Sequence, residues 1–514
     1  MKTIRLSAIA VLPAAVWSLA VTGPVSIAAE TTPKKPNIVF ILTDDLGIND
    51  LGCYGRREHH TPHLDALAAE GTRFMSAYCA QPICSPSRAA ILTGKNPARL
   101  HLTTYLPGRP DCPSQKLLHP IIRQQLPLAE MTLPKYLKPA GYVSACIGKW
   151  HLGGKGFGPA EQGFDYVHAG RPNTTPSETE GGKGEYDLTA HAIQFIEENR
   201  DRPFFLYLAH NTPHIPYTAR APLVEKNSKA FEPVYAAVIE TLDDVVGLVL
   251  AKLDELGLVK NTILVFTSDN GGLHVPELKH EKVTHNTPYR AGKGFLHEGG
   301  LRIPLIVRWP GHVPAGRIVN EPVVNSDWVP TLLKMCGVTP SQSGAKSDDG
   351  KRASRSDATT FDGVSLASLL AGGDAPKRPF FWHFPHYTNQ GSQPEGAIRD
   401  GDWKLIEYYE EGRVELFNLA QDPGEKNNLA DREPERVQQL RAGLAAWRNA
   451  TVVQTNTPNP RFDPALHRAL YEDMDVSRYN ASTADAAEFA RVLQWRKLMD
   501  SVVPRPPKKA QGDH

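Results

Sequence analysis

The sequence predicts an α/β protein built on a large, mixed, mostly parallel sheet that helices cover on both faces. Short apolar runs alternate with helical patterns along most of the 514 residues, as expected for strands that are buried on both sides. The composition changes after Leu333, where a polar stretch at 341–360 precedes a hairpin pattern. Because the chain exceeds the usual size of one domain, we expect a large domain and a smaller one.

Four apolar runs are predicted to be strands that end at one edge of this sheet. They cover residues 37–42, 142–147, 204–208 and 262–266. In parallel α/β sheets the carboxyl ends of the strands share an edge, and ligands bind in the crevice there. Polar residues follow every run, namely Asp44 and Asp45, Lys149 and His151, His210, and Asp269 and Asn270. We therefore expect these side chains to meet at that edge.

A helix is predicted to begin immediately after Cys84. Ser85 is a suitable N-cap and Pro86 suits the first helical position. The free N–H groups of the first turn favour a bound sulfate or phosphate. Arg88 lies one turn after Cys84 on the same helix face and offers a planar fork to two anion oxygens. The alternative interpretation is an ordinary capped helix with a buried cysteine.

Two pairs of oxygen donors predict a metal site. Asp44 and Asp45 follow one strand, and Asp269 and Asn270 follow another. Carboxylate and amide oxygens are the ligands that a hard cation such as Ca²⁺ or Mg²⁺ prefers. Either pair alone also suits a turn or a helix cap. Two pairs at two strand ends, close to the Cys84 helix in the expected architecture, favour the metal site.

The string Cys84-x-Pro86-Ser87-Arg88-x-x-x-Leu92-Thr93-Gly94 resembles the signature of the type I sulfatases, in the alkaline-phosphatase superfamily. It matches that signature at every fixed position. The resemblance implies a sulfatase-like fold with a small C-terminal antiparallel sheet. It also implies that Cys84 is oxidised to formylglycine (3-oxoalanine), so a formylglycine-generating enzyme is an expected partner during maturation. The implied metal ligands are Asp44, Asp45, the modified Cys84, Asp269 and Asn270, and the expected ion is Ca²⁺ in preference to Mg²⁺.

Three further segments resemble the basic part of a sulfatase site. Gly148-Lys149-Trp150-His151 implies a lysine that binds sulfate and a histidine that contacts the formylglycine. The segment 210–216 implies that His214 lies beside the leaving-group oxygen and that His210 is structural. The segment 290–304 implies that Lys293 bridges sulfate and leaving group, whereas Gly299, Gly300 and Arg302 are fold elements. The implied catalytic residues are Cys84, Arg88, Lys149, His151, His214 and Lys293.

The reaction that the resemblance implies is hydrolysis of a sulfate ester in two steps. An oxygen of the hydrated aldehyde at position 84 attacks sulfur, and His214 or Lys293 protonates the departing alcohol. His151 then removes a proton from the second hydroxyl, so that sulfate leaves. No soluble organic cofactor is required.

The N-terminus resembles a secretory signal peptide at residues 1–29. Lys2 and Arg5 precede an apolar run at 6–21, and small residues near 26–29 suit cleavage. This predicts a secreted or periplasmic protein. An uncleaved anchor is the alternative, but the run is short and contains Pro13. No later segment is apolar enough to cross a bilayer, so we expect no stable membrane insertion.

The expected domain boundaries follow from the composition and the resemblance. A catalytic domain is predicted at 36–375, a small α+β subdomain at 376–450 with a hairpin at 403–417, and an extension at 451–514 to which the resemblance assigns no role. The six cysteines are widely spaced, and we assign no disulfide. The glycine-rich segment 181–184 lacks the spacing of a phosphate loop and is interpreted as a flexible connector.

The net charge and the predicted export limit the classes of substrate and partner that we expect. A net charge of +1 argues against nucleic acid. Export and the aromatic and imidazole residues at 381–387 favour a small-molecule or oligosaccharide sulfate ester, of galactose or N-acetylgalactosamine in particular. A packed strand is the alternative for 381–387. Two other functions remain open: a phosphomonoester or phosphodiester hydrolase of the same superfamily, or an unmodified, non-catalytic homologue that binds sulfated glycans.

Overall fold

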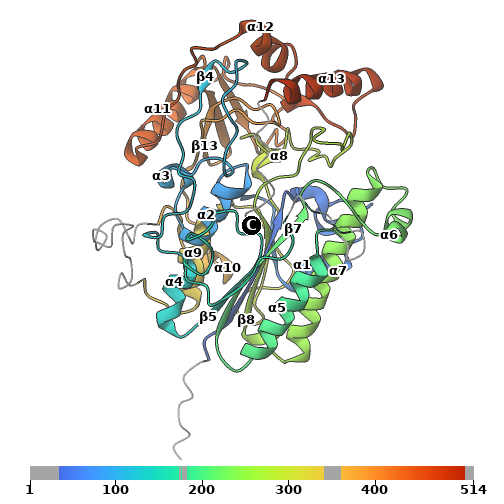
Figure 1. The fold of residues 1–514 in the computed structure, drawn as a ribbon. Helices are drawn as coiled ribbons and strands as arrows, with labels where there is room; N and C mark the ends of the chain where they lie inside the picture. Colours follow the sequence, from blue (N-terminus) through green and yellow to red (C-terminus); the bar gives the residue numbers. More distant parts are fainter. Residues whose placement is uncertain (1–33, 173–174, 176, 178–181, 341–360, 504–514) are drawn as a thin grey trace, which may run out of the picture. The chain divides into compact units, whose positions relative to one another are not determined.

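The computed structural model describes residues 34–172, 175, 177, 182–340 and 361–503. The predicted signal peptide and the polar stretch 341–360 lie outside the described residues. Residues 35–514 form one compact unit. Its centre is an eight-stranded sheet in the order β10-β2-β9-β8-β1-β7-β5-β6 (Figure 1).

The four predicted strands lie side by side in this sheet. They are β8 (Thr262–Ser268), β1 (Asn37–Asp44), β7 (Phe204–Pro213) and β5 (Val143–Gly148). These strands pair in parallel, as do β5 with β6 and β10 with β2, whereas β9 is antiparallel to β8 and β2. The prediction of a mixed, mostly parallel sheet is therefore confirmed. The remaining strands are β2 (Thr72–Phe74), β6 (Tyr166–His168), β9 (Leu305–Arg308) and β10 (Arg317–Val319).

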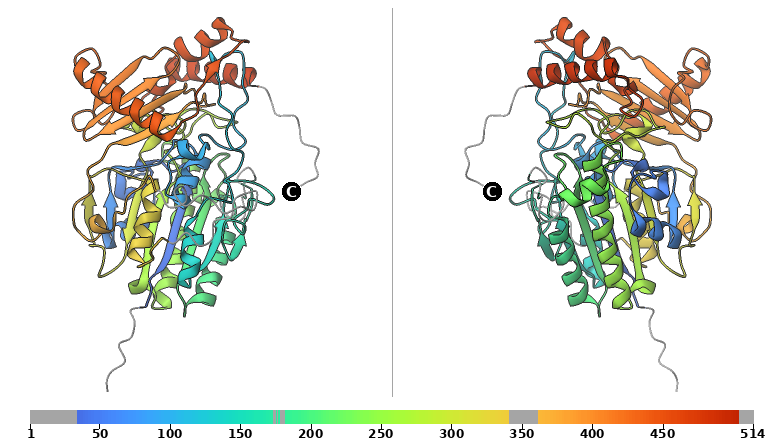
Figure 2. Two further views of the ribbon diagram at one scale, coloured as in Figure 1. Left: turned by 90° about the vertical axis from the view of Figure 1, so that its left-hand side faces the viewer. Right: turned by 90° about the vertical axis from the view of Figure 1, so that its right-hand side faces the viewer.

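Helices cover both faces of the sheet, as Figures 1 and 2 show. Ile38 and Phe40 of β1 pack in the core that includes α2 and α9, whereas Val39 and Ile41 pack in the core that includes α1, α5 and α7. Burial on both sides explains why β1 is continuously apolar. These helices are α1 (Pro62–Glu70), α2 (Cys84–Thr93), α5 (Glu185–Asn199), α7 (Pro233–Glu255) and α9 (Trp328–Met335). Short helices are α3 (Pro97–Leu100), α4 (Leu133–Leu137), α6 (Ala221–Lys226), α8 (Glu298–Leu301), α10 (Ala367–Leu370) and α12 (Pro464–His467).

A four-stranded antiparallel sheet forms the smaller subdomain. Its strands are β12 (Phe380–Phe384), β13 (Glu395–Asp400), β14 (Trp403–Tyr408) and β15 (Val414–Asn418). Leu440 and Leu444 of α11 (Pro434–Thr451) pack on one face, and Trp382 and Ile406 join the main core from the other. The predicted hairpin is thus β14 and β15. Two small two-stranded sheets pair β3 (Ala77–Tyr78) with β11 (Val323–Val324) and β4 (Leu117–Leu118) with β16 (Thr457–Pro458).

Residues 451–503, for which the sequence predicted no structure, are part of the fold. Trp495 and Met499 of α13 (Ala486–Val502) are buried in the same core as β1, together with Leu470 and Val476. The apolar residues of α13 are spread around the helix, so the sequence gave no clear helical face. The predicted boundaries at 375 and 450 remain predictions.

The aromatic segment 381–387 is a packed strand and its continuation. Trp382, Phe384 and Tyr387 are at most 1% exposed. His383 is hydrogen-bonded to Tyr409, 2.7 Å away, so its imidazole is used within the protein. Of the two interpretations of this segment, the packed strand is the one that the structure shows, because its rings serve the packing of the small sheet.

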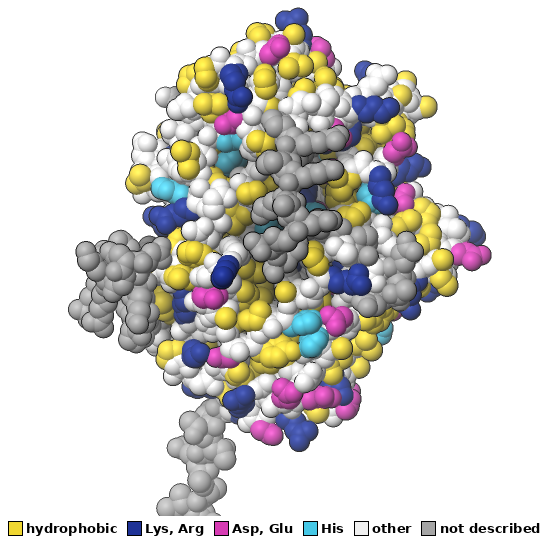
Figure 3. All heavy atoms as spheres, viewed as in Figure 1, with side chains coloured by type: hydrophobic (Ala, Val, Ile, Leu, Met, Phe, Trp, Pro, Cys, Tyr) yellow, Lys and Arg dark blue, Asp and Glu magenta, His cyan; other side chains and the backbone are white. Residues whose placement is uncertain are grey.

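All six cysteines are free thiols. Among the described residues, no helix is both long enough and apolar enough to span a membrane. Basic and acidic side chains are interspersed over the face shown in Figure 3, in line with the small net charge.

Candidate active site

The carboxyl ends of the four central strands meet at the start of α2. Asp44 ends β1, Lys149 follows β5, and Asp269 follows β8. The Asp45 amide donates to Asp269 Oδ1 over 3.2 Å, and the Cys84 thiol at the start of α2 lies 3.2 Å from His151 Nδ1. The structure therefore brings together the residues that the sequence placed at separate strand ends.

Helix α2 begins two residues earlier than predicted, at Cys84 and not at Pro86. Cys84 is its first residue, Ile83 occupies the N-cap position, and no side chain caps the helix. The predicted Ser85 cap was wrong, because the Ser85 hydroxyl lies within the first turn and accepts a hydrogen bond from the Leu106 amide at 3.2 Å. Cys84 is only 3% exposed. Its side chain is thus held in the first turn, beside His151.

His151 is oriented as a base toward residue 84. Its Nε2 lies 2.9 Å from the carbonyl oxygen of Leu106. Since a carbonyl only accepts, Nε2 carries the proton, and a neutral ring then turns the lone pair of Nδ1 toward Cys84. Burial, with Lys149 nearby, lowers the pKa of His151 to about 4. The ring is therefore neutral near pH 7 and able to accept a proton from the group at position 84.

Arg88 holds the acidic residues in place. Its Nε and one terminal nitrogen each lie 2.8 Å from Asp269 Oδ2, and its other terminal nitrogen donates to the Lys149 carbonyl over 2.9 Å. The Arg88 guanidinium, which was expected to bind two oxygens of a substrate anion, thus binds groups of the protein instead. The physical reason is that Arg88 is fully buried beside two carboxylates, Asp269 and Asp44, which require a cation.

Asp44 and Asp45 each pair with a lysine. Lys149 Nζ donates to Asp44 Oδ2 over 2.5 Å, and Lys293 Nζ donates to Asp45 Oδ2 over 2.7 Å. Burial raises the pKa of Asp44, but Lys149 and the other cations outweigh burial and hold it well below its ordinary value. The Asn270 amide donates to Asp45 Oδ1 over 2.8 Å. Asp44 and Asp45 are therefore ionised.

The donor set fits a hard cation. Asp44 Oδ1 and the Asn270 side-chain oxygen are buried and have no hydrogen-bond partner. Such unsatisfied oxygens are rare in proteins and call for an explanation. Three carboxylates, Asp44, Asp45 and Asp269, here face three permanent cations, Arg88, Lys149 and Lys293. A divalent ion would satisfy both oxygens and leave two surplus positive charges, which favour an anionic substrate.

His214 directly follows β7, which flanks β1 on the side away from β8, and it is partly exposed. Its Nε2 is 3.7 Å from Asp45 Oδ2, and its Nδ1 donates to the Ile215 carbonyl over 2.6 Å. Burial, with Lys293 nearby, lowers the pKa of His214 to about 3. His210 is fully buried and bonded to Glu185 of α5, which agrees with the structural role expected for it.

Lys183 is a residue of this site that the sequence analysis missed. It lies in the glycine-rich segment interpreted as a connector, yet it is only 2% exposed. Its Nζ donates to the carbonyls of His214 and Ile215, with the second bond at 2.9 Å. Burial lowers the pKa of Lys183 to about 7. Lys183 therefore positions the backbone of His214, and no spacing rule in the sequence would have identified it.

Close backbone contacts hold the loop that carries Lys293. A Cβ atom on Gly299 would lie 2.3 Å from the Ala291 carbonyl oxygen, so only glycine fits there. Arg302 pairs with Glu298, which also accepts from Lys404 Nζ over 2.8 Å. The structure thus agrees with the interpretation of the Gly299 and Arg302 region as fold elements.

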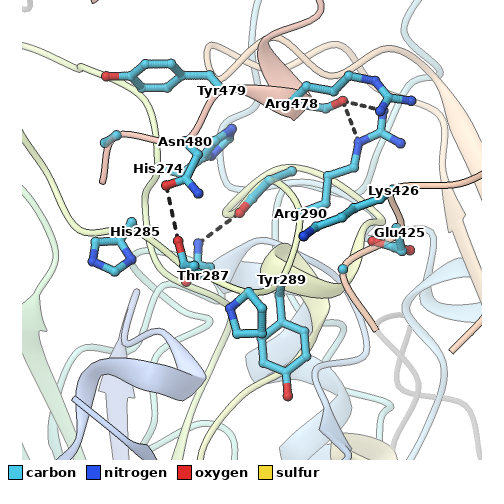
Figure 4. Close-up of a pocket in the computed structure, with 16 residues that line it drawn as sticks. His274, His285, Thr287, Tyr289, Arg290, Glu425, Lys426, Arg478, Tyr479 and Asn480 are labelled. Carbon is cyan, nitrogen blue, oxygen red and sulfur yellow. Dashed lines mark hydrogen bonds between the residues drawn. The ribbon is translucent and has the colours of Figure 1, made fainter. Parts of the chain in front are cut away.

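A separate pocket lies behind this loop (Figure 4). It has a volume of about 130 Å³ and is bordered by Tyr289, Arg290, Lys426 and the extension at 477–481. The Arg290 guanidinium spans the pocket and donates hydrogen bonds to Ser477 Oγ, over 2.6 Å, and to the Asp475 carboxylate. None of the expected catalytic residues lines this pocket. Arg290 thus attaches the extension to the loop.

Glu395→Gln is expected to flatten the pH dependence of stability. The Leu296 amide donates to Glu395 Oε1 over 2.8 Å, Oε2 has no partner, and burial raises the pKa of Glu395 to about 8. The folded state therefore keeps a proton that the unfolded chain releases above its ordinary pKa of about 4.3. Stability from this group is complete below that value and is lost as the pH rises to 8. Unfolding midpoints between pH 5 and pH 9 measure the effect.

The matched control is the exposed Glu321→Gln, which we expect to retain the native pH dependence. If Glu395→Gln also retains it, Glu395 is ionised in the folded protein and this interpretation is wrong.

Comparison with known proteins adds three findings. A family model described as Sulfatase matches residues 36–338, and one described as N-sulphoglucosamine sulphohydrolase, C-terminal, matches 351–450. N-acetylgalactosamine-6-sulfatase of Homo sapiens is 35% identical over 459 residues, covering 79% of this chain and 83% of the relative. Arylsulfatase A of Homo sapiens is 31% identical over 477 residues, covering 79% and 87%. The crystal structure of Ps i-CgsB in complex with k-i-k-neocarrahexaose is similar with a TM-score of 0.67 and 27% identity, covering 80% of this chain and 93% of that one.

Proposed function

Because the chain belongs to the sulfatase family of sulfuric ester hydrolases, we propose that it hydrolyses sulfate esters of carbohydrates with a formylglycine made from Cys84 and a bound Ca²⁺. The observation that carries this proposal is the contact of Cys84 with His151 next to oxygen donors that lack partners. The named relatives supply the substrate class: one is an N-acetylgalactosamine-6-sulfatase, and one structure contains a neocarrahexaose.

The metal would be held by Asp44, Asp45, Asp269, Asn270 and the modified residue 84. All four side chains are buried and offer oxygen, and none of them is a thiolate or an imidazole. A divalent cation at this position draws electron density from the sulfate oxygens and makes sulfur more open to attack. The size and the flexible coordination of Ca²⁺ suit a donor set that comes from two strand ends better than the strict octahedron of Mg²⁺ does.

The protein's own residues supply binding and proton transfer. A hydrated aldehyde at position 84 supplies an oxygen nucleophile and a second hydroxyl, which a thiol lacks. His151 Nδ1 accepts a proton from position 84, since its other nitrogen is committed to Leu106. Lys149 and Lys293 reach the two aspartates and place positive charge where a sulfate binds. Arg88 keeps Asp269 in position.

His214→Ala is expected to separate the two candidates for the leaving-group acid. His214 can act as this acid only if the bound sulfate anion raises its pKa enough for Nε2 to carry a proton, because the free ring is neutral near pH 7. If His214 protonates the departing alcohol in this way, its loss lowers kcat/KM for a sugar sulfate by about 10²- to 10⁴-fold. Hydrolysis of 4-nitrophenyl sulfate should change far less, because nitrophenolate leaves without a proton. Lys293→Ala should slow both substrates, since Lys293 also contributes charge for binding the sulfate.

The exposed His60→Ala serves as the matched control and should behave as the native enzyme. Equal losses on both substrates in His214→Ala would assign a binding role to His214 and leave Lys293 as the acid.

A direct assay tests the proposed function. N-acetylgalactosamine 6-sulfate, 4-nitrophenyl sulfate and 4-nitrophenyl phosphate are compared as substrates of protein whose residue 84 is shown by peptide mass spectrometry to be the aldehyde. We expect the sulfates to be hydrolysed and the phosphate to be a poor substrate. Preference for the phosphate, or failure to hydrolyse any sulfate with Ca²⁺ present, would overturn the proposal.

We also propose that residues 1–29 direct export and are removed. The observation behind this proposal is the charge and hydropathy pattern of these residues. Sequencing of the mature N-terminus after expression in a bacterial host tests it.

A further inference from the structure

A second cluster of potential metal ligands lies away from the proposed active site. His168 is the last residue of β6, the edge strand of the large sheet, and Asp187 and His191 lie one turn apart on α5. One nitrogen of each histidine and one oxygen of Asp187 lie within 4.8 Å of one another. All three side chains are partly exposed, between 26% and 46%. Figure 3 shows histidine side chains beside an acidic one on the surface over α5.

The distances between these ligand atoms are close to those between atoms that coordinate one metal ion. His168 Nε2 is 2.8 Å from Asp187 Oδ2, and His191 Nε2 is 3.9 Å from Asp187 Oδ1. Zn–N and Zn–O bonds of about 2.0–2.2 Å place tetrahedral ligands roughly 3.4 Å apart. Small rotations of half-exposed side chains bring both distances to that value.

A neighbouring side chain orients one of the imidazoles. The Tyr166 hydroxyl lies 2.8 Å from His191 Nδ1, so the other nitrogen, Nε2, faces Asp187. Metal-binding histidines commonly use their second nitrogen in this way. The rings of His168 and His191 stack with centroids 3.6 Å apart. Binding one ion through both Nε2 atoms requires the two rings to turn out of this stack, which their partial exposure allows.

We propose that His168, Asp187 and His191 form a transition-metal site, with Zn²⁺ as the expected ion and water in the fourth position. Imidazole nitrogen favours Zn²⁺ over Ca²⁺, so this site differs in chemistry from the oxygen donors around Asp44. The exposure of all three ligands leaves room for the water.

The ion would connect the edge strand to the helix that supports the active site. His168 belongs to β6, whereas Asp187 and His191 belong to α5. The first residue of α5, Glu185, is fully buried and binds His210 and Thr212 near the end of β7. Zn²⁺ bound here raises the unfolding temperature and leaves the sulfatase chemistry to the other site.

Titration calorimetry with Zn²⁺ on the Ca²⁺-saturated protein tests the proposal. The titrations use a Cys53→Ser background, because Cys53 is a half-buried thiol that can bind zinc. We expect one ion per chain and a rise in the unfolding temperature. His191→Gln should raise the dissociation constant at least about tenfold and remove the thermal shift, and Tyr166→Phe should weaken binding to a smaller extent.

The exposed His60→Gln is the control and should bind Zn²⁺ as the parent does. Unfolding temperatures without Zn²⁺ show whether each variant is folded. Absence of binding in the parent, or binding that His191→Gln and His168→Gln leave unchanged, would overturn the proposal, and neither outcome bears on sulfate hydrolysis.

Discussion

Cys84→Ser is expected to abolish steady-state turnover of 4-nitrophenyl sulfate, with a fall in kcat of at least about 10⁴-fold. In the native protein the Cys84 sulfur lies 3.2 Å from His151 Nδ1, and a serine places one oxygen at the same position. That oxygen can still attack the sulfur of the sulfate ester. It has no second hydroxyl, however, and has no route to expel the sulfate once it is attached. We therefore expect one turnover per molecule at most.

Two measurements check this expectation. Stopped assays give the steady-state rate, and intact mass spectrometry shows whether the Cys84→Ser protein gains one SO₃ group after exposure to substrate. Cys53→Ser, at another half-buried thiol, should keep native activity and is the control. Turnover of Cys84→Ser at a rate near that of the aldehyde-bearing enzyme would contradict the proposed role of residue 84.

The burial of Cys84 also bears on when it is modified. All residues of α2, from Cys84 to Thr93, are buried, and the helix packs against the large sheet and α9. A modifying enzyme cannot read this segment in the folded protein. If formylglycine is made, it is therefore made before residue 84 is enclosed by the fold.

The strands and the convergence of polar groups could be predicted because both are local properties of the sequence. A strand buried on both faces, such as β1, has to be apolar along its length, and its last residues have to change character where it leaves the core. Parallel pairing then places the ends of β1, β5, β7 and β8 at one edge, whatever else the chain does.

The partners of individual side chains could not be predicted, because they depend on contacts between distant residues. Arg88 meets Asp269, which is 181 positions away, and Ser85 meets the Leu106 amide in a loop. Lys183 lies in a segment whose glycines suggest only flexibility, yet it supports His214. The apolar residues of α13 in the extension do not fall on one clear helix face, and they are recognisable as core only when packed beside β1.

Asp45→Asn is expected to lower kcat/KM for sulfate esters by more than about 100-fold and to remove the response to Ca²⁺. Asp45 accepts from Lys293 and lies 3.7 Å from His214 Nε2, so its charge serves both the proposed metal and the basic groups. Neutralising it weakens the metal site and leaves Lys293 buried without its main partner, at a cost of up to about 3–5 kcal/mol in unfolding free energy.

Removal of the metal provides the matching measurement. In the native protein, a chelator should lower both activity and the unfolding temperature, and added Ca²⁺ should restore them. An ion at 100 times its dissociation constant stabilises by about 2.7 kcal/mol. Asp45→Asn should show neither change, whereas the exposed Asp254→Asn should respond as the native protein does. Full activity in the presence of chelator would exclude the proposed metal.

Asparagine is the right replacement at this position because of the backbone. Asp45 has a φ of 67°, in the left-handed region that few residues other than glycine, asparagine and aspartate adopt readily. Alanine would add backbone strain to the loss of charge, and the two effects could not be separated. Asparagine keeps the shape, the conformation and one acceptor oxygen for Asn270, so a loss of Ca²⁺ response in Asp45→Asn can be assigned to the missing negative charge.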